Sequence, residues 1–247
     1  MKQILLILLI IQSAFFAFSQ DYTYTTSRLQ SAPPLLDGLF NDEAWHNAVW
    51  CKSPFTQLEP YEDRPATQNT SFAILFDDNN LYVAIRAEDS AADKINRQLL
   101  RRDNEAADWV GIIIDSYEDK LTGFSFAVTA SGTKLDNMIV NDNSNDYSWD
   151  PIWYVKTKID AAGWSAEMRI PLSQLRFTKK QQYHWGLEIA RFIYRNKELS
   201  FWRPLKRSSS KIVSNFGTLE GVTDISPKKD IELFPFAVGK LIFMEKR

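Results

Sequence analysis

The sequence predicts an all-β protein, an antiparallel sandwich of two sheets with a short helix near its N-terminus. Many short runs alternate apolar and polar residues with a period of two, turn-forming clusters separate these runs, and almost no stretch shows a helical period. Eight tryptophans and sixteen phenylalanines supply apolar area for a core, and the only cysteine, Cys51, has no partner for an internal disulfide. Packing must therefore stabilise the fold.

The first residues are typical of a secretory signal peptide. Lys2 precedes an apolar run from Ile4 to Ile11, and the small residues Ala17 and Ser19 stand before a polar stretch. The run is short for a membrane span and no basic stop follows it, although an uncleaved anchor is the alternative. We expect removal of residues 1–19 and export through the inner membrane, to the periplasm, the outer membrane or the extracellular space.

The charge of the chain argues against two classes of partner. The formal net charge is -2, and loss of Lys2 with the signal peptide makes the mature chain more negative by one. This value is too small to direct the protein to nucleic acid or to anionic lipid.

Residues 20–33 are expected to be an extended entry segment, because they are polar and lead into a Pro-Pro pair. Asn41 is then placed to cap a short helix that carries Ala44, Trp45 and Ala48 on one side. We expect this helix to be a lid that packs Trp45 against the core.

The strands of the first half follow from alternation. A hairpin is predicted around the turn Asp77–Asn80, and a continuous apolar run then indicates a strand that is buried on both faces or belongs to a sandwich core. The expected strands are Thr70–Phe76, Leu81–Ala87, Trp109–Asp115, Phe124–Val128 and Leu135–Val140. The polar stretch Asn141–Asp150 is expected to be a surface loop.

The second half repeats this pattern. Ala162-Gly163 is expected to turn one strand into the next, and Leu172–Phe177 is expected to be a short helical turn. The predicted strands are Tyr154–Ile159, Trp164–Ile170, Trp185–Tyr194, an edge strand at Ser200–Trp202, and Gly217–Gly221. Alternation assigns Trp164 and Trp185 to the core. The basic, serine-rich segment Pro204–Asn215 is interpreted as a solvated loop, with a phosphate site as the alternative.

A new apolar alternation begins near Asp230 and has no partner left in the chain. Residues 224–247 are therefore interpreted as a linker and the start of a further β domain that is missing or truncated.

Several motifs in this order resemble the family 9 carbohydrate-binding modules. They are LLDGLFNDEAW, FDDNNLYVAI, DWVGIIIDSY, WDPIW, GWSAEMRIPLSQL and WGLEIAR, and the module is expected to span residues 34–223. The resemblance implies a jelly-roll or immunoglobulin-like sandwich, structural calcium, and binding of glucans or xylans beside a glycoside hydrolase. The chain looks most like a Bacteroidetes-type envelope branch, in which a β-rich domain follows the module.

The segment EAADWVGIII departs from the sugar-binding members of that family. Glu105 stands where those members have a tryptophan, and Gly111 stands where they have a glutamate. Ala127 and Thr129 replace an arginine and an asparagine on the next strand. The family's usual sugar clamp is therefore not expected to be assembled in the same way.

Saccharide recognition needs a flat apolar ring for the sugar face and planar polar groups for paired hydroxyls. The candidate rings are Trp202, which the resemblance matches to the family's second site tryptophan, Trp149 and Trp153. The candidate hydroxyl partners are Arg191, Asp136, Asn137, Asp150 and Arg102. Core packing is the alternative role for each tryptophan, and a solvated loop is the alternative for Arg102.

Calcium prefers clustered oxygen ligands, so the candidate metal residues are Asp77, Asp78 and Asn79, with simple turn chemistry as the alternative. Catalysis by this domain is not expected. His46 and His184 lack the spacing of zinc ligands, and no serine nucleophile motif is present. A glycosidase with two facing carboxylates is the alternative.

We therefore predict a secreted, monomeric, non-catalytic carbohydrate-binding module for plant-type or other β-glycans, active in carbohydrate catabolism. The alternative is an envelope interaction domain that has lost sugar binding and serves an attached C-terminal β-barrel-like domain.

Overall fold

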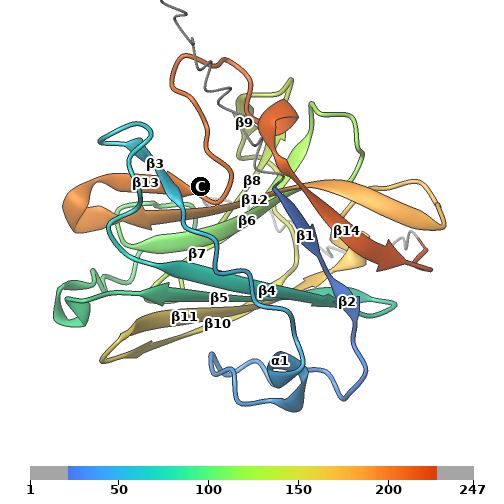
Figure 1. The fold of residues 1–247 in the computed structure, drawn as a ribbon, viewed down its shortest axis with the longest axis horizontal. Coiled ribbons are helices and arrows are strands. Elements are labelled where there is room, and N and C mark those ends of the chain that lie inside the picture. Colours follow the sequence, from blue (N-terminus) through green and yellow to red (C-terminus); the bar gives the residue numbers. More distant parts are fainter. Residues whose placement is uncertain (1–21, 227–247) are drawn as a thin grey trace, which may run out of the picture.

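The structure, a computed structural model, describes residues 22–226 and is a sandwich of two mixed sheets (Figure 1). One sheet has nine strands and the other has five. This confirms the predicted all-β fold with two packed sheets. The predicted signal peptide and the apolar alternation after Asp230 lie outside the described residues.

Seven strands of the nine-stranded sheet follow one another in the order β1, β14, β12, β6, β7, β8 and β9, and β13 continues from β12 to β3. Their bounds are β1 (Thr23–Thr25), β3 (Thr56–Glu59), β6 (Trp109–Asp115), β7 (Gly123–Thr129), β8 (Lys134–Val140), β9 (Ser144–Asp146), β12 (Gln182–Ile193), β13 (Glu198–Phe201) and β14 (Gly217–Thr223).

The five-stranded sheet has the order β10, β11, β5, β4 and β2. Its strands are β2 (Ser27–Arg28), β4 (Thr70–Phe76), β5 (Asn80–Glu88), β10 (Tyr154–Asp160) and β11 (Gly163–Pro171). The helical elements are α1 (Glu43–His46) and four short 3-10 turns at Ala92–Lys94, Leu172–Gln174, Tyr194–Asn196 and Val213–Asn215.

The N-terminal segment makes both sheets mixed. β1 pairs with β14 and β2 pairs with β4, and both pairings are parallel, whereas all other named pairs are antiparallel. The amide of Thr26, between these two strands, donates to the carbonyl of Glu220. Part of the predicted extended segment 20–33 thus forms an edge strand of each sheet. The sequence did not predict these strands, because the segment shows no apolar–polar alternation.

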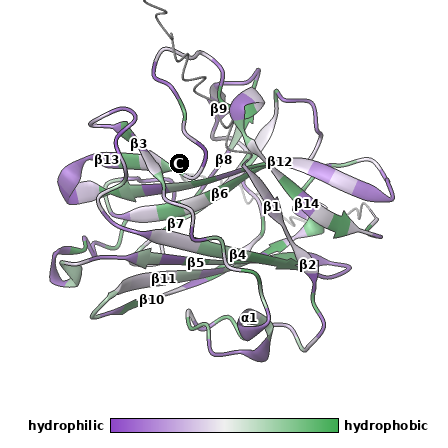
Figure 2. Cartoon of the chain, in the orientation of Figure 1, coloured by the Kyte–Doolittle hydropathy of each residue, from purple (hydrophilic) through white to green (hydrophobic). Residues whose placement is uncertain are grey.

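The core lies between the two sheets and is built from the alternating residues that the sequence indicated. Phe72, Ile74, Val83 and Ile85 of the five-stranded sheet are fully buried, as is Phe126 of the facing sheet. Trp164 and Trp185 are also buried, as alternation predicted. In Figure 2 the hydrophobic colour follows the long strands, whereas the connecting loops are mostly hydrophilic.

The single turn α1 covers the outer face of the five-stranded sheet (Figure 1). Trp45 is buried there, and its indole Nε1 donates to Glu167 Oε1 at 2.7 Å. The other oxygen of Glu167 accepts the amides of Asp37 and Gly38. The N-cap is Asp42 and not Asn41, and Asp42 makes no side-chain cap bond, so the predicted cap is corrected.

Most predicted strands agree with the structure, and the differences occur at polar segments. The stretch Asn141–Asp150, expected to be a loop throughout, contains β9, which pairs with β8. The predicted edge strand near Ser200 is β13, and it is not an edge because β3 pairs with its other side. In both cases the difference arises because β9 and β13 pair with other strands, and a local sequence pattern does not show such pairing.

Within residues 22–226, no helix is long and apolar enough to span a bilayer.

Candidate functional site

A groove of about 320 Å³ lies on the outer face of the nine-stranded sheet, away from the five-stranded sheet. Strands β6, β7, β8, β12 and β13 form its floor, β9 and its following turn stand at one end, and β3 stands at the other. Its walls are completed by the loop of residues 205–212, which we call the basic loop.

Small residues make the floor low. Gly111, Ala127 and Ala190 lie opposite one another on β6, β7 and β12 and form one row across the sheet. A Cβ atom on Gly111 would stand 2.6 Å from the Cβ of Ala127, so nothing larger than glycine fits without movement. Leu135 and Phe201 end this row on β8 and β13, and both line the groove. The hollow therefore exists because large side chains flank a row of small ones.

Aromatic rings border this floor. Trp109 lines the groove and stacks on Phe192, with ring centroids 5.9 Å apart and an interplanar angle of 26°. Tyr147 follows β9 and is 55% exposed. Such rings offer flat apolar faces, which suit the C–H faces of a sugar.

Amide side chains lie beside Tyr147. Asn137 Nδ2 donates to Asn145 Oδ1 at 2.8 Å, and Asn145 Nδ2 lies 3.5 Å from the hydroxyl of Tyr147. Asn137, a predicted site residue, therefore lies in the groove. Each amide can donate and accept, so this end of the groove suits a ligand with hydroxyl groups.

The basic loop is anchored at both ends. Asp142 accepts hydrogen bonds from the amides of Ile212 and Ser214, at 3.0 and 2.9 Å, and from the Ser214 hydroxyl. At the other end, Arg207 donates to the carbonyls of Leu58 and Pro60, at 2.8 Å each. The segment predicted to be a solvated loop is thus fixed by hydrogen bonds and forms a wall of the groove.

Glu188 lies on the groove side of β12, one row from Ala190, and is fully buried. Its Oε1 accepts the amides of Ile189 and Arg203 at 3.0 Å each, whereas its Oε2 has no hydrogen-bond partner among the described residues. Burial raises the pKa of Glu188 to about 8. The carboxyl group is therefore held mainly in its neutral form at neutral pH.

Three of the predicted ligand residues lie in the core. Trp202 packs edge-on against Tyr22 and Phe72, and Trp153 packs edge-on against Phe126; both tryptophans are buried. Arg191 is also buried. A ring or guanidinium enclosed in this way has no surface for a sugar, so the groove, not these side chains, is the candidate site.

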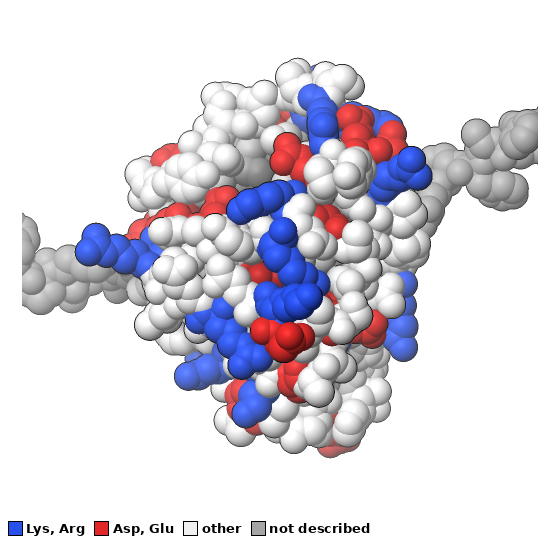
Figure 3. Space-filling model, turned by 90° about the vertical axis from the view of Figure 1, so that its left-hand side faces the viewer, with Lys and Arg blue, Asp and Glu red and all other residues white. Residues whose placement is uncertain are grey.

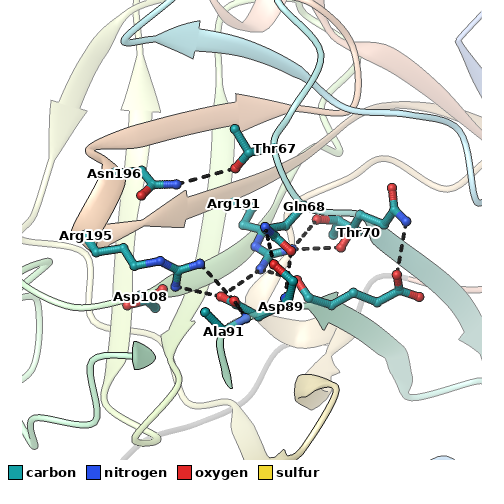
Figure 4. A network of polar contacts seen from close by, with 12 residues as sticks. Thr67, Gln68, Thr70, Asp89, Ala91, Asp108, Arg191, Arg195 and Asn196 are labelled. Carbon is teal, nitrogen blue, oxygen red and sulfur yellow. Dashed lines mark hydrogen bonds and ion pairs between the residues drawn. The ribbon is translucent and has the colours of Figure 1, made fainter. Parts of the chain in front are cut away.

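Arg191 joins the two sheets through a polar network (Figure 4). Its guanidinium donates to the carbonyls of Asn69 and Glu88, at 2.8 and 2.6 Å, and to Thr70 Oγ1 at 3.2 Å. Asp89 lies 3.9 Å away and forms a two-bond pair with Arg195. Burial lowers the pKa of Arg191 to about 10, so the side chain is a structural cation at neutral pH.

Three other predicted residues form a second cluster behind the groove, together with Trp153. Arg102 donates to both carboxylate oxygens of Asp136 at 2.8 Å and also pairs with Asp150. Trp153 Nε1 donates to Asp136 at 3.1 Å. Asp136 is buried on the core side of β8, so this cluster holds the chain after β9 against β8. Trp149 is half-buried on Phe124 and Phe126.

Three of the four positions at which the sequence is expected to depart from sugar-binding family members lie in the groove. Glu105, Gly111 and Ala127 all line it, whereas Thr129 is buried outside it. The groove-facing aromatic on β13 is Phe201, one residue before Trp202. Glu105, Gly111 and Ala127, which the sequence predicts as departures from the family pattern, therefore lie together in the groove.

Sequence reasoning missed most residues of the groove, among them Trp109, Tyr147, Asn145 and Phe201. Alternation along Trp109-Val110-Gly111 places the first and third on the face opposite the core, which is a usable signal. Tyr147 and the basic loop offered no such signal, because tertiary contacts bring them to the site.

The predicted metal residues do not fit calcium in this arrangement. Asp77 Oδ1 accepts the amides of Asn79 and Asn80 at 2.7 Å each, and Oδ2 accepts the Tyr82 hydroxyl. Asp78 pairs with Arg28. Oxygens used in a turn beside a guanidinium make a poor cation site. Within residues 22–226, no group of three or more His, Cys, Asp or Glu side chains is placed to hold a metal ion.

A two-sheet sandwich with a ligand-sized groove on one outer sheet face defines the class as a β-sandwich module. The chain belongs to the carbohydrate family 9 binding domain-like family, whose model matches residues 36–199. This membership confirms the resemblance stated from the motifs.

Solved structures share the fold. A family 9 carbohydrate-binding module from Caldicellulosiruptor kristjanssonii, solved with cellotriose, has 19% identity and a TM-score of 0.54 over 87% of this chain and 99% of that one. The structure with glucose has 19% identity and a TM-score of 0.57 over 86% and 100% of the chains. A putative carbohydrate-binding protein from Bacteroides uniformis has 12% identity and a TM-score of 0.61 over 80% and 98%. No curated protein matches the chain.

Proposed function

We propose that the chain is a non-catalytic saccharide-binding module and that the groove on the nine-stranded sheet is its binding site. The observation that carries this proposal is the groove itself, in which a row of small residues lies between aromatic rings, among them the exposed Tyr147, and amide groups. A pyranose can rest its C–H face on this floor while amides bond its hydroxyls.

Family membership and the neighbours solved with cellotriose and glucose support a saccharide as the ligand class. We further propose that the protein is a secreted monomer, that it binds plant-type β-glycans, and that it acts beside a glycoside hydrolase. Protein sequencing of the mature chain from a cell fraction would test export, with Gln20 expected as the first residue.

Calorimetric titration with cello- and xylo-oligosaccharides tests the binding site. We expect Tyr147→Ala to weaken binding about tenfold or more, because a stacking face is removed. Tyr154→Ala is the matched control, since Tyr154 is similarly exposed but lies on β10 in the other sheet. Equal affinity for wild type and Tyr147→Ala would place the site elsewhere.

A second candidate function is an interaction domain of the cell envelope that has lost sugar binding. The replacement of the family's clamp by Gly111 and Ala127 favours it. If the folded protein bound neutral, acidic and sulfated saccharides equally poorly, this function would be preferred.

A further inference from the structure

Resting on the proposed function, we propose that the groove prefers saccharides that carry an anionic group, a carboxylate or a sulfate ester, over their neutral counterparts. The anionic group would lie against the basic loop, and the neutral hydroxyls would lie toward Asn137 and Asn145.

Charge is distributed unevenly around the groove. Lys206, Arg207 and Lys211 line it on the basic loop, whereas Glu105 is the one acidic residue of its lining. Lys206 pairs with Asp63. Among residues 22–226, neither Arg207 nor Lys211 forms an ion pair with a carboxylate, so two positive charges at the groove are left without a counterion from the protein.

Arg207 is held in place without being neutralised. Its Nε and Nη2 donate to backbone carbonyls of Leu58 and Pro60, which orient the guanidinium but carry no net charge. Its Nη1 has no hydrogen-bond partner among the described residues. A guanidinium oriented in advance loses little freedom when it binds a carboxylate or a sulfate.

The backbone at Lys211 is also held. The Lys211 carbonyl accepts Asn215 Nδ2 at 2.7 Å, and the neighbouring Ser210 carbonyl accepts Asn143 Nδ2 at 2.6 Å. The side chain of Lys211 is exposed. The charge is thus carried on a fixed segment, and the flexible side chain can reach an anionic group.

Glu105 gives the groove a polarity. It precedes β6 and lines the groove together with Asn145 and Tyr147, so it stands at the end where β9 lies. Burial and then the charge of Glu105 raise the pKa of the Tyr147 hydroxyl, and burial raises the pKa of Glu105 itself. A negative ligand group is repelled there and attracted by the basic loop. A saccharide with an acidic residue is therefore oriented along the groove, whereas a neutral one is not.

Only local charge can produce this preference. The formal net charge of the chain is -2, and Figure 3 shows a face on which basic and acidic side chains are interleaved. Long-range attraction of polyanions is therefore not expected.

Calorimetric titration of the mature full chain with trigalacturonate and with its methyl ester tests the preference, because esterification removes the negative charges and adds only a methyl group to each carboxyl. We expect the acid to bind about tenfold or more tightly than the ester, with the difference shrinking as salt is added. A sulfated oligosaccharide and its desulfated form, titrated in parallel, distinguish the two sources of anionic charge.

Equal binding of the charged and neutral members of both pairs would overturn the preference and leave the proposed function intact. If none of the four binds while cello- or xylo-oligosaccharides do, the preference alone is overturned; if no saccharide of either experiment binds, the proposed function is overturned as well. A tighter charged member in either pair supports the preference and identifies the anionic group.

Substitutions in the basic loop test whether its positive charges cause the preference. The readout is the ratio of the affinities for the charged and the neutral member of a pair. Lys211→Gln should lower this ratio several-fold, and Arg207→Lys should lower it as well because lysine keeps the charge but loses the fork. Lys156→Gln is the matched control, since Lys156 is exposed on β10 in the other sheet. Loss of the preference in the control, or its survival in both groove variants, would overturn the assignment to the basic loop.

Discussion

The two faces of the nine-stranded sheet hold arginines in opposite situations. On the inner face, Arg191 is buried, donates to two carbonyls and a hydroxyl, and lies near Asp89. On the outer face, Arg207 also donates to two carbonyls but is exposed at a groove and has no carboxylate partner among residues 22–226. Both arginines are thus held by backbone carbonyls. The buried Arg191 stabilises the fold, whereas the exposed Arg207 keeps a positive charge at the groove, which we propose is available to a ligand.

Among the predicted substitutions, the largest change in stability is expected on the inner face. Arg191→Met should lower the free energy of unfolding by about 3 to 5 kcal/mol, because Asp89 and two carbonyls lose a buried cation. Urea unfolding followed by tryptophan fluorescence measures the change.

Arg86→Met is the matched control for that variant, because Arg86 forms a more exposed pair with Asp160. We expect a loss of about 1 kcal/mol or less. An equally small loss at Arg191 would contradict the structural role of the inner network.

The next effect concerns Glu188 beneath the outer face and depends on pH. Its folded-state pKa of about 8 lies above the usual 4.5, so its contribution to stability is complete below pH 4.5 and is lost as the pH rises toward 8. Glu188→Gln cannot ionise and should remove this loss. Relative to wild type, the variant should gain roughly 2 to 3 kcal/mol between pH 5 and pH 7.

Urea midpoints of both proteins across this pH range check the Glu188 prediction. A difference between variant and wild type that does not change with pH would show that Glu188 ionises as freely in the folded chain as in the unfolded one.

The smallest effect concerns the groove floor. Gly111→Ala should cost about 1 to 2 kcal/mol, because the new methyl group meets Ala127 at 2.6 Å. Saccharide affinity should fall as well, since the floor is raised. The double variant Gly111→Ala with Ala127→Gly exchanges the two side chains and should recover most of the stability. Failure to recover would mean that the contact with the Ala127 methyl group is not the cause of the lost stability.

Local pattern was enough for the hairpin β4–β5, for β10–β11 and for the core positions of Trp164 and Trp185, because strand alternation depends on neighbours along the chain. It was not enough for β3, β9 or the parallel edges β1 and β2, which are short and whose partners are remote in sequence. The same limit applied to Trp202, since an exposed and a buried tryptophan read alike.

The sequence by itself determined an all-β sandwich of the family 9 type, since alternation and ordered motifs are properties of the chain. Only the tertiary structure revealed the groove that we propose as the binding site. The groove is formed by strands and a loop that are far apart in sequence, and its floor exists because Gly111, Ala127 and Ala190 come into register. Burial of Trp202, Trp153 and Arg191, and exposure of Tyr147 and Arg207, follow from that assembly.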